Sequence, residues 1–175
     1  MKVLVAAAVL FGLGAVAHAD LPKPTTPPIT DSKFKFKAPA GWKDKTTGDA
    51  TLYTLAVDEP HSLVFQAKVQ LGEAPADEPL LDRYAEEARK SVLRMLPDSK
   101  FKVLQKSLVT VAGVPAARFV FEMIPPGSGG SVRQLQFYIP TNHMHAVLTF
   151  TAPSDHFDEN VALFEKTADA TTVKP

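Results

Sequence analysis

Apolar and polar residues alternate along much of the chain, most clearly in the segment SLVFQAKVQL, residues 62–71. The apolar set and the polar set occupy alternate positions: Leu63, Phe65, Ala67, Val69 and Leu71 against Gln66, Lys68 and Gln70. Because successive side chains of a strand point to opposite faces of a sheet, this period of two predicts strands with one buried face. The chain is therefore expected to be built around a sheet.

Further strands are predicted at residues 33–37, 51–57, 101–111, 116–124, 132–139 and 144–151, most of them joined by short turns. Two segments have helical spacing instead. In the first, Asp77 can cap a helix that stops at Pro97, with Pro79 tolerated in its first turn. In the second, Ser154 or Asp155 can cap a helix whose apolar stripe is Phe157, Val161, Phe164 and Ala168. Short links favour antiparallel pairing, so we expect an α+β fold with an antiparallel sheet of about six or seven strands and two main helices packed on it.

The stretch YIPTNHMHAVLTFT, residues 138–151, places two histidines beside a predicted turn. A turn centred on Thr141-Asn142 puts Tyr138 opposite His145 and separates the apolar from the polar side chains, whereas a slip by one residue mixes them. His143 and His145 then share one face, and two imidazoles can bind zinc, copper or nickel. A zinc site needs three or four ligands, and His61 and His156 lie far away in sequence. Polar residues beside a turn are the simpler interpretation, so no metal site and no cofactor is assigned.

The same analysis predicts a polar sheet face. Its members lie on at least three strands: Gln66, Lys68, Gln70, Gln134, Gln136, Tyr138 and His145. If no helix covers it, this face is a broad hydrogen-bonding surface suited to a partner. The alternatives are that it meets solvent only, or that one helix lies across it.

The composition argues against several kinds of chemistry. The sequence has no cysteine, which excludes disulfides, thiolate nucleophiles and zinc sites that use cysteine. The run Gly127-Ser128-Gly129-Gly130 lacks the Lys-Ser/Thr of a phosphate loop and is not a G-x-S-x-G nucleophile elbow. Neighbouring acids such as Glu86 and Glu87 point in different directions on a helix. No catalytic residue is therefore predicted.

The first 30 residues are expected to lie outside the fold. Residues 1–19 combine Lys2, an apolar run to Val16 and the small residues Ala17 and Ala19, as in a secretory signal cleaved between Ala19 and Asp20. The run is too short to span a bilayer, so no stable membrane insertion is expected after cleavage. Residues 20–30 hold four prolines and predict a flexible tether. One domain is then expected over residues 31–175, in the periplasm or secreted.

The net charge of the chain limits the class of partner that it can bind. Without residues 1–19 the chain has 18 Lys and Arg against 19 Asp and Glu. This balance argues against nucleic acid, whose phosphates require a concentrated basic face.

Three segments resemble one family. FKFKAPAGW, residues 34–42, resembles the opening strand and Pro-x-Gly-Trp turn of PsbP-like and DcrB-like proteins. VTVAGVPAARFVFE, residues 109–122, resembles their central hairpin, and residues 133–168 resemble their closing hairpin and helix. The resemblance implies a compact α+β domain and a non-catalytic role, as in photosystem II subunits, envelope proteins and secretion chaperones. In that family helices can cover both sheet faces, but the polar strand faces here lead us to expect heavier coverage on one side.

These observations lead to one expected function and one alternative. We expect an exported, non-catalytic binding or accessory module of the cell envelope that contacts an envelope or secreted protein. The alternative is a metal-binding protein or metal-dependent enzyme that uses His143 and His145.

Overall fold

The computed structural model describes the chain in seven stretches: residues 34–35, 43–44, 51–58, 61–71, 74–141, 144–170 and 172–173. Side chains are described for residues 63–67, 74–140 and 145–170. The predicted signal, the tether, Asn142 and His143 lie outside the described residues.

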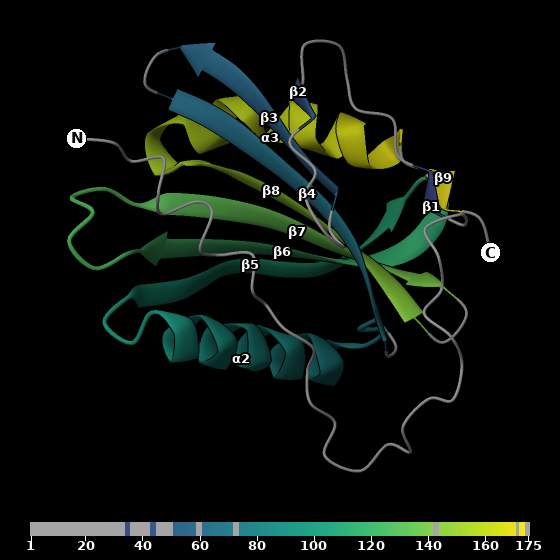
Figure 1. Ribbon diagram of the computed structural model, residues 1–175. Helices are drawn as coiled ribbons and strands as arrows, with labels where there is room; N and C mark the ends of the chain where they lie inside the picture. Colours follow the sequence, from purple (N-terminus) through teal and green to yellow (C-terminus); the bar gives the residue numbers. More distant parts are fainter. Residues whose placement is uncertain are drawn as a thin grey trace.

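The elements follow one another in the order β1 (Phe34–Lys35), β2 (Lys43–Asp44), β3 (Thr51–Asp58), β4 (His61–Leu71), α2 (Glu78–Met95), β5 (Lys100–Val111), β6 (Val114–Ile124), β7 (Val132–Thr141), β8 (Met144–Pro153), α3 (Ser154–Asp169) and β9 (Thr172–Val173) (Figure 1). The main sheet orders its strands β2-β3-β4-β8-β7-β6-β5, and every neighbouring pair is antiparallel. β1 pairs with β9 in a separate two-stranded sheet. The predicted α+β class and antiparallel pairing are confirmed.

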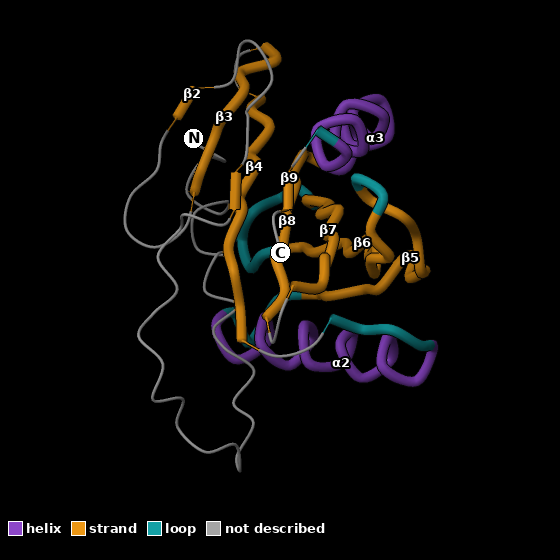
Figure 2. Tube along the Cα trace, turned by 90° about the vertical axis from the view of Figure 1, so that its right-hand side faces the viewer, coloured by secondary structure: helices purple, strands orange, loops and turns teal. Residues whose placement is uncertain are grey.

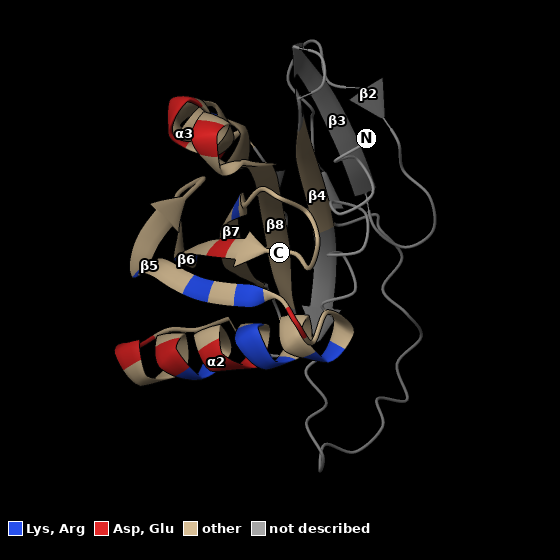
Figure 3. Ribbon diagram, turned by 90° about the vertical axis from the view of Figure 1, so that its left-hand side faces the viewer, with Lys and Arg blue, Asp and Glu red and all other residues tan. Residues whose placement is uncertain are grey.

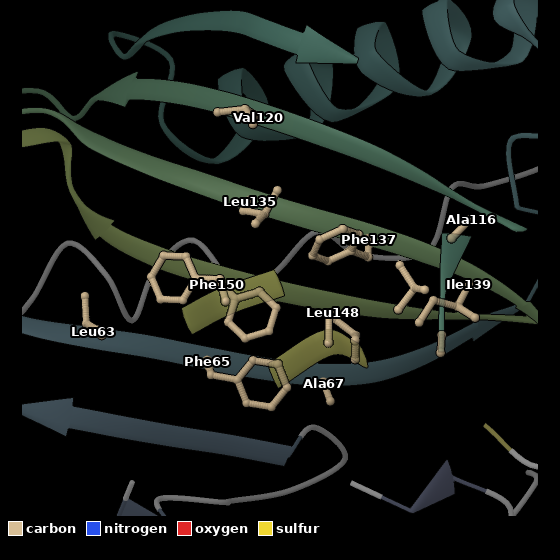
Figure 4. Close-up of a cluster of buried hydrophobic side chains, with 14 of the residues drawn as sticks. Leu63, Phe65, Ala67, Ala116, Val120, Leu135, Phe137, Ile139, Leu148 and Phe150 are labelled. Atoms are coloured by element: carbon tan, nitrogen blue, oxygen red, sulfur yellow. The ribbon is translucent and has the colours of Figure 1, made fainter. Parts of the chain in front are cut away.

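The two helices lie on opposite sides of strands β5 to β8, as Figure 2 shows. On one face, Phe157 and Phe164 of α3 join a cluster with Phe65, Phe137 and Phe150 (Figure 4). On the other face, Leu81, Tyr84, Ala85 and Ala88 of α2 pack against Ala117, Phe119, Phe121, Tyr138 and Val147. Both faces are thus covered, and the expectation of heavier coverage on one side is wrong.

Of the two predicted helix caps, the one at the start of α2 is confirmed and the one at the start of α3 is wrong. The Asp77 side chain accepts a hydrogen bond from the Leu80 N–H at 2.9 Å, so this cap is as predicted. α3 instead begins at Ser154 after Pro153, with no hydrogen bond from a capping side chain. The reason is that β8 runs directly into α3. The Ser154 N–H donates to the Ser131 carbonyl at 3.0 Å, which ties the helix start to the loop before β7.

The β7–β8 hairpin keeps its predicted faces but not its predicted register. Tyr138 lies opposite Val147, and Pro140 lies opposite His145. The connection therefore lies between Thr141 and Met144, and the pairing is displaced by two positions from the predicted one. Because side chains repeat every two residues, this displacement leaves each residue on its predicted face.

The turn between β5 and β6 offers a test of backbone conformation. Ala112 and Gly113 have φ values of 50° and 80°, a combination that favours asparagine followed by glycine in a two-residue hairpin turn. Ala112→Asn is therefore expected to raise the free energy of unfolding by about 0.5–1 kcal/mol. Ala112→Val should lower it by about 1 kcal/mol, since a β-branched side chain is strained at positive φ. Urea denaturation of both variants checks this, and equal stabilities would contradict the assigned turn.

No helix within the described ranges is long and apolar enough to cross a membrane.

Candidate functional site

Three polar side chains of β7 form a hydrogen-bonded row inside the protein. Gln134, Gln136 and Tyr138, called here the polar row, occupy alternate positions of the strand and are all buried. The Gln136 Nε2 donates to the Gln134 Oε1 at 3.1 Å, and the Tyr138 hydroxyl donates to the Gln136 Oε1 at 3.0 Å. Gln136 is 0% exposed, so these bonds replace water for both ends of its amide.

Neighbouring strands add polar groups to the same face. Thr149 of β8 lies opposite Gln136 on one side and Gln66 of β4 on the other, and Thr151 lies opposite Gln134. All three of these neighbours are buried. Within the described part of the chain, the Thr151 hydroxyl oxygen has no hydrogen-bond partner. The predicted grouping of polar side chains from β4, β7 and β8 on one face is thus present.

This face is not an open surface, because α2 lies across it. The Tyr84 ring of α2 meets the Tyr138 ring edge-on, with ring centroids 5.6 Å apart, and meets the His145 ring at 6.0 Å. The interpretation of this face as an open binding surface, which required that no helix cover it, is therefore wrong for Gln66, Gln134, Gln136, Tyr138 and His145. The alternative that one helix covers the face is correct. The side chains of Lys68 and Gln70 lie outside the described part.

The sequence feature that could have predicted the covering helix lies on β6. Phe119 and Phe121 share the face of the polar row and provide the apolar surface that holds α2. The Phe119 ring meets the Tyr138 ring at a centroid distance of 5.3 Å. Combining the aromatic alternation of β6 with the polar positions of β7 could have predicted a covered face of mixed character.

Burial raises the pKa of Tyr138, and the nearby Tyr84 and Glu87 raise it further. The phenol therefore stays protonated at neutral pH and remains a hydrogen-bond donor. Its acceptor is an amide oxygen, which is too weak a base to remove the proton. The polar row thus has the character of a structural network that fixes the interior, and it does not activate a nucleophile.

The suggested metal pair of His143 and His145 lies partly outside the described residues, so only His145 can be placed. His145 is buried and packs against Tyr138, with ring centroids 5.4 Å apart, as well as against Tyr84. His156 lies on α3, where its Nδ1 is 2.8 Å from the Glu159 carboxylate. His143 and the side chain of His61 lie outside the described residues. Among the residues that are described, no group of three or more His, Cys, Asp or Glu side chains is placed to hold a metal ion.

An exposed patch lies at the open end of the β5–β6 hairpin, away from the turn at Ala112 and Gly113. Ile124 is 39% exposed and lies opposite Lys100, which is also exposed. Lys102 is exposed two positions further along β5. Figure 3 shows basic residues on β5. We call Lys100, Lys102 and Ile124 the hairpin patch.

The lysines of the hairpin patch form no ion pair with another described residue. Glu122 lies opposite Lys102, but the Arg133 Nε binds its carboxylate at 3.0 Å. The hydrogen bond that Arg133 donates to Glu122 raises the pKa of Arg133, and Arg133 also pairs with Asp158 of α3 at 3.1 Å. The acid opposite Lys102 is thereby engaged by Arg133, which leaves a positive, partly apolar surface. The sequence signal is Ile124 itself, an apolar residue out of phase with Phe119, Phe121 and Met123.

Comparison with known proteins finds no matching family model and no matching curated protein. Solved structures do match. The PsbP of the cyanobacterium Synechocystis sp. PCC 6803 is 13% identical, with 82% of this chain and 88% of that chain covered and a TM-score of 0.60. A Pseudomonas aeruginosa protein of unknown function, PA94, described as a putative regulator, is 16% identical, with coverages of 79% and 90% and a TM-score of 0.55.

A third similar structure is the Ran-binding protein Mog1p of Saccharomyces cerevisiae. It is 11% identical over 81% of this chain and 84% of that chain, with a TM-score of 0.52. At these identities the similarity concerns the fold alone. The antiparallel sheet between two helices is therefore the PsbP-like α+β fold that the sequence resemblance implied.

Proposed function

We propose that this chain is an exported, non-catalytic accessory module of the cell envelope that acts by contact with a partner protein. The hairpin patch is the observation that carries the proposal. A large apolar side chain beside two lysines that form no ion pair with another described residue suits a partner that presents an apolar pocket edged by carboxylates. The polar sheet face is not the contact surface in this proposal, because it is buried.

Two further observations support an exported binding module. The N-terminal sequence has the pattern of a cleaved secretory signal, which directs the mature chain to the periplasm or the exterior. The PsbP-like fold also includes a protein described as Ran-binding, so this architecture can carry a surface for another protein. Neither feature requires a cofactor.

Site-specific photo-crosslinking in intact cells tests the proposal. A photoreactive amino acid at position 124 is expected to give a covalent adduct with another protein, which mass spectrometry identifies. The same amino acid at Glu159, an exposed position on α3, serves as the reference. The same adducts from both positions, or none from position 124, would contradict the proposal.

Charge reversal supplies the matched control. Lys100→Glu combined with Lys102→Glu is expected to lower the yield of the adduct by about tenfold or more, because like charges then face the partner. Lys90→Glu combined with Lys166→Glu makes the same change in net charge on α2 and α3. That variant should leave the yield within about twofold of the original, since its charges lie away from the contact.

A further inference from the structure

β5 is the last strand of the main sheet, and no described strand lies along its outer edge. Its two ends differ. The stretch from Lys100 to Lys106 carries three lysines, Lys100, Lys102 and Lys106, and has an irregularity in its pairing between Val103 and Gln105. Lysines and bulges are the usual means by which an edge strand is kept from pairing with another chain.

The stretch after Lys106 lacks these protections. Residues 107–111, Ser-Leu-Val-Thr-Val, carry no charge and pair with β6 without interruption. We call this stretch the open segment. Leu108 is 47% exposed, although leucine is costly to leave in water at an edge. The open segment is therefore suited to receive a further strand.

The turn shows which backbone groups face outward. Val111 and Val114 flank the two-residue turn, so this pair exchanges both of its hydrogen bonds within the hairpin. Hydrogen bonding alternates along an antiparallel strand, so Leu108 and Thr110 direct their N–H and C=O groups to the outer edge. Pro115, which has no N–H group, lies opposite Thr110. At this position β6 donates no N–H to β5, so the proline fits the assigned hydrogen-bond pattern.

We propose that the open segment pairs antiparallel with the open segment of a second copy of this chain, about a two-fold axis at Val109. Leu108 of each copy then lies opposite Thr110 of the other, and the outward groups of these two residues form hydrogen bonds across the axis. The exposed Leu108 side chains become covered. Both sheets join into one.

Charge favours a second copy in this orientation. The pairing places Lys106 of one copy opposite the second copy's Ala112, whose N–H is bound by the carboxylate of Asp169 at 3.2 Å. Lys106 keeps its own partner in this arrangement, because its Nζ is paired with the Asp82 carboxylate of the same copy, so no uncompensated lysine enters the paired stretch. A parallel arrangement in the same register would instead set Lys106 beside the second copy's Lys106, which is repulsive.

The pairing leaves the hairpin patch accessible on both copies. Lys100 and Ile124 lie at the far end of the hairpin from the open segment. A dimer would present two such patches and bind a repeated partner with higher avidity. The pairing itself does not depend on the proposed function.

Because the sequence has no cysteine, a single introduced cysteine can test the pairing directly. Val109 is its own opposite residue across the axis, at a site without mutual hydrogen bonds, where Cα atoms lie about 4.5 Å apart, within the range for a disulfide. Val109→Cys should therefore form a covalent dimer under mild oxidation, at least about tenfold faster than Thr110→Cys, whose two copies are offset along the strands. Equal rates for the two variants would overturn the proposal.

A second measurement does not depend on an introduced cysteine. Light scattering after size-exclusion chromatography is expected to show a dimer for the wild type and a monomer for Thr110→Pro, which removes an outward N–H. A monomeric wild type up to about 100 μM would also overturn the pairing, since a useful interface holds well below that concentration. Thr110→Pro should keep the photo-adduct at position 124, so failure of the dimer and failure of the proposed function are distinguishable.

Discussion

Replacing Phe150 by alanine is expected to lower the free energy of unfolding by about 3–5 kcal/mol, because it removes a ring from the centre of the larger apolar cluster. The Phe150 ring stacks on Phe65 with centroids 4.5 Å apart and on Phe164 of α3 at 5.1 Å. It also meets Phe137 edge-on at 6.3 Å. Two sheet strands and one helix therefore lose contacts with one substitution, and the cavity is too enclosed to collapse.

Guanidinium or urea denaturation measures this effect, with an unchanged m-value as evidence that the unfolded state is the same. Phe150→Leu should cost clearly less, about 1–2 kcal/mol, since most of the volume is kept. Leu108→Ala is the surface reference, because Leu108 is 47% exposed, and it should stay within about 0.5 kcal/mol of the wild type. A cost for Phe150→Ala no larger than that of Leu108→Ala would be incompatible with the described core.

Gln136→Glu is expected to have a similarly large effect, but one that depends on pH. When protonated, the glutamic acid can donate to the Gln134 Oε1 and accept from the Tyr138 hydroxyl, as the amide does. When ionised, it places a charge at a side chain that is 0% exposed. Burial therefore raises the pKa of the introduced carboxyl in the folded state.

The sign of the pH dependence follows from this direction. Below pH about 4.3, the carboxyl is protonated in both states and the variant should be almost as stable as the wild type. As the pH rises above that value, the unfolded chain ionises while the folded chain holds its proton. The free energy of unfolding then falls by about 1.4 kcal/mol per pH unit relative to the wild type, reaching a loss of roughly 3–4 kcal/mol near pH 7.

The matched control for this experiment lies on β5. Gln105 is exposed and accepts a hydrogen bond from the Arg118 Nη1 at 2.8 Å, so Gln105→Glu makes the same chemical change beside a cation. This variant should show a difference of less than about 1 kcal/mol from the wild type at pH 7. If Gln136→Glu has the same flat pH profile as Gln105→Glu, the polar row is not buried as described.

The predictable part of the fold is the part that local periodicity determines. The alternation in β4, β7 and β8 placed Phe65, Phe137 and Phe150 on one face, and they share one cluster. The predicted pairing of β7 with β8 was wrong by two positions, because a period of two cannot distinguish pairings that differ by two. Faces are thus determined locally, whereas register also depends on the turn and on the neighbouring strands.

The covering of the polar face could not be predicted from strand patterns alone. Gln134 and Gln136 look solvent-exposed in an alternating sequence, since burying an amide is costly unless its hydrogen bonds are made. Their partners become visible only when the side chains are placed, with Tyr138 donating to one glutamine and that glutamine donating to the other. The polar row is therefore an interior network, and the exposed apolar surface lies on β5 and β6 instead, at Leu108 and Ile124.

The strand order also determines when the sheet can be completed during synthesis. β4 (His61–Leu71) lies between β3 and β8 (Met144–Pro153), so its neighbour on one side is made only after the intervening chain of residues 72–143. Strands β5 to β8 are linked one to the next and can form early, because their contacts are close in sequence. The first strands must wait for the last hairpin to emerge. A chain that passes through a secretion channel with its N-terminus first would then remain unfinished, and so threadable, until nearly all of it has been translated.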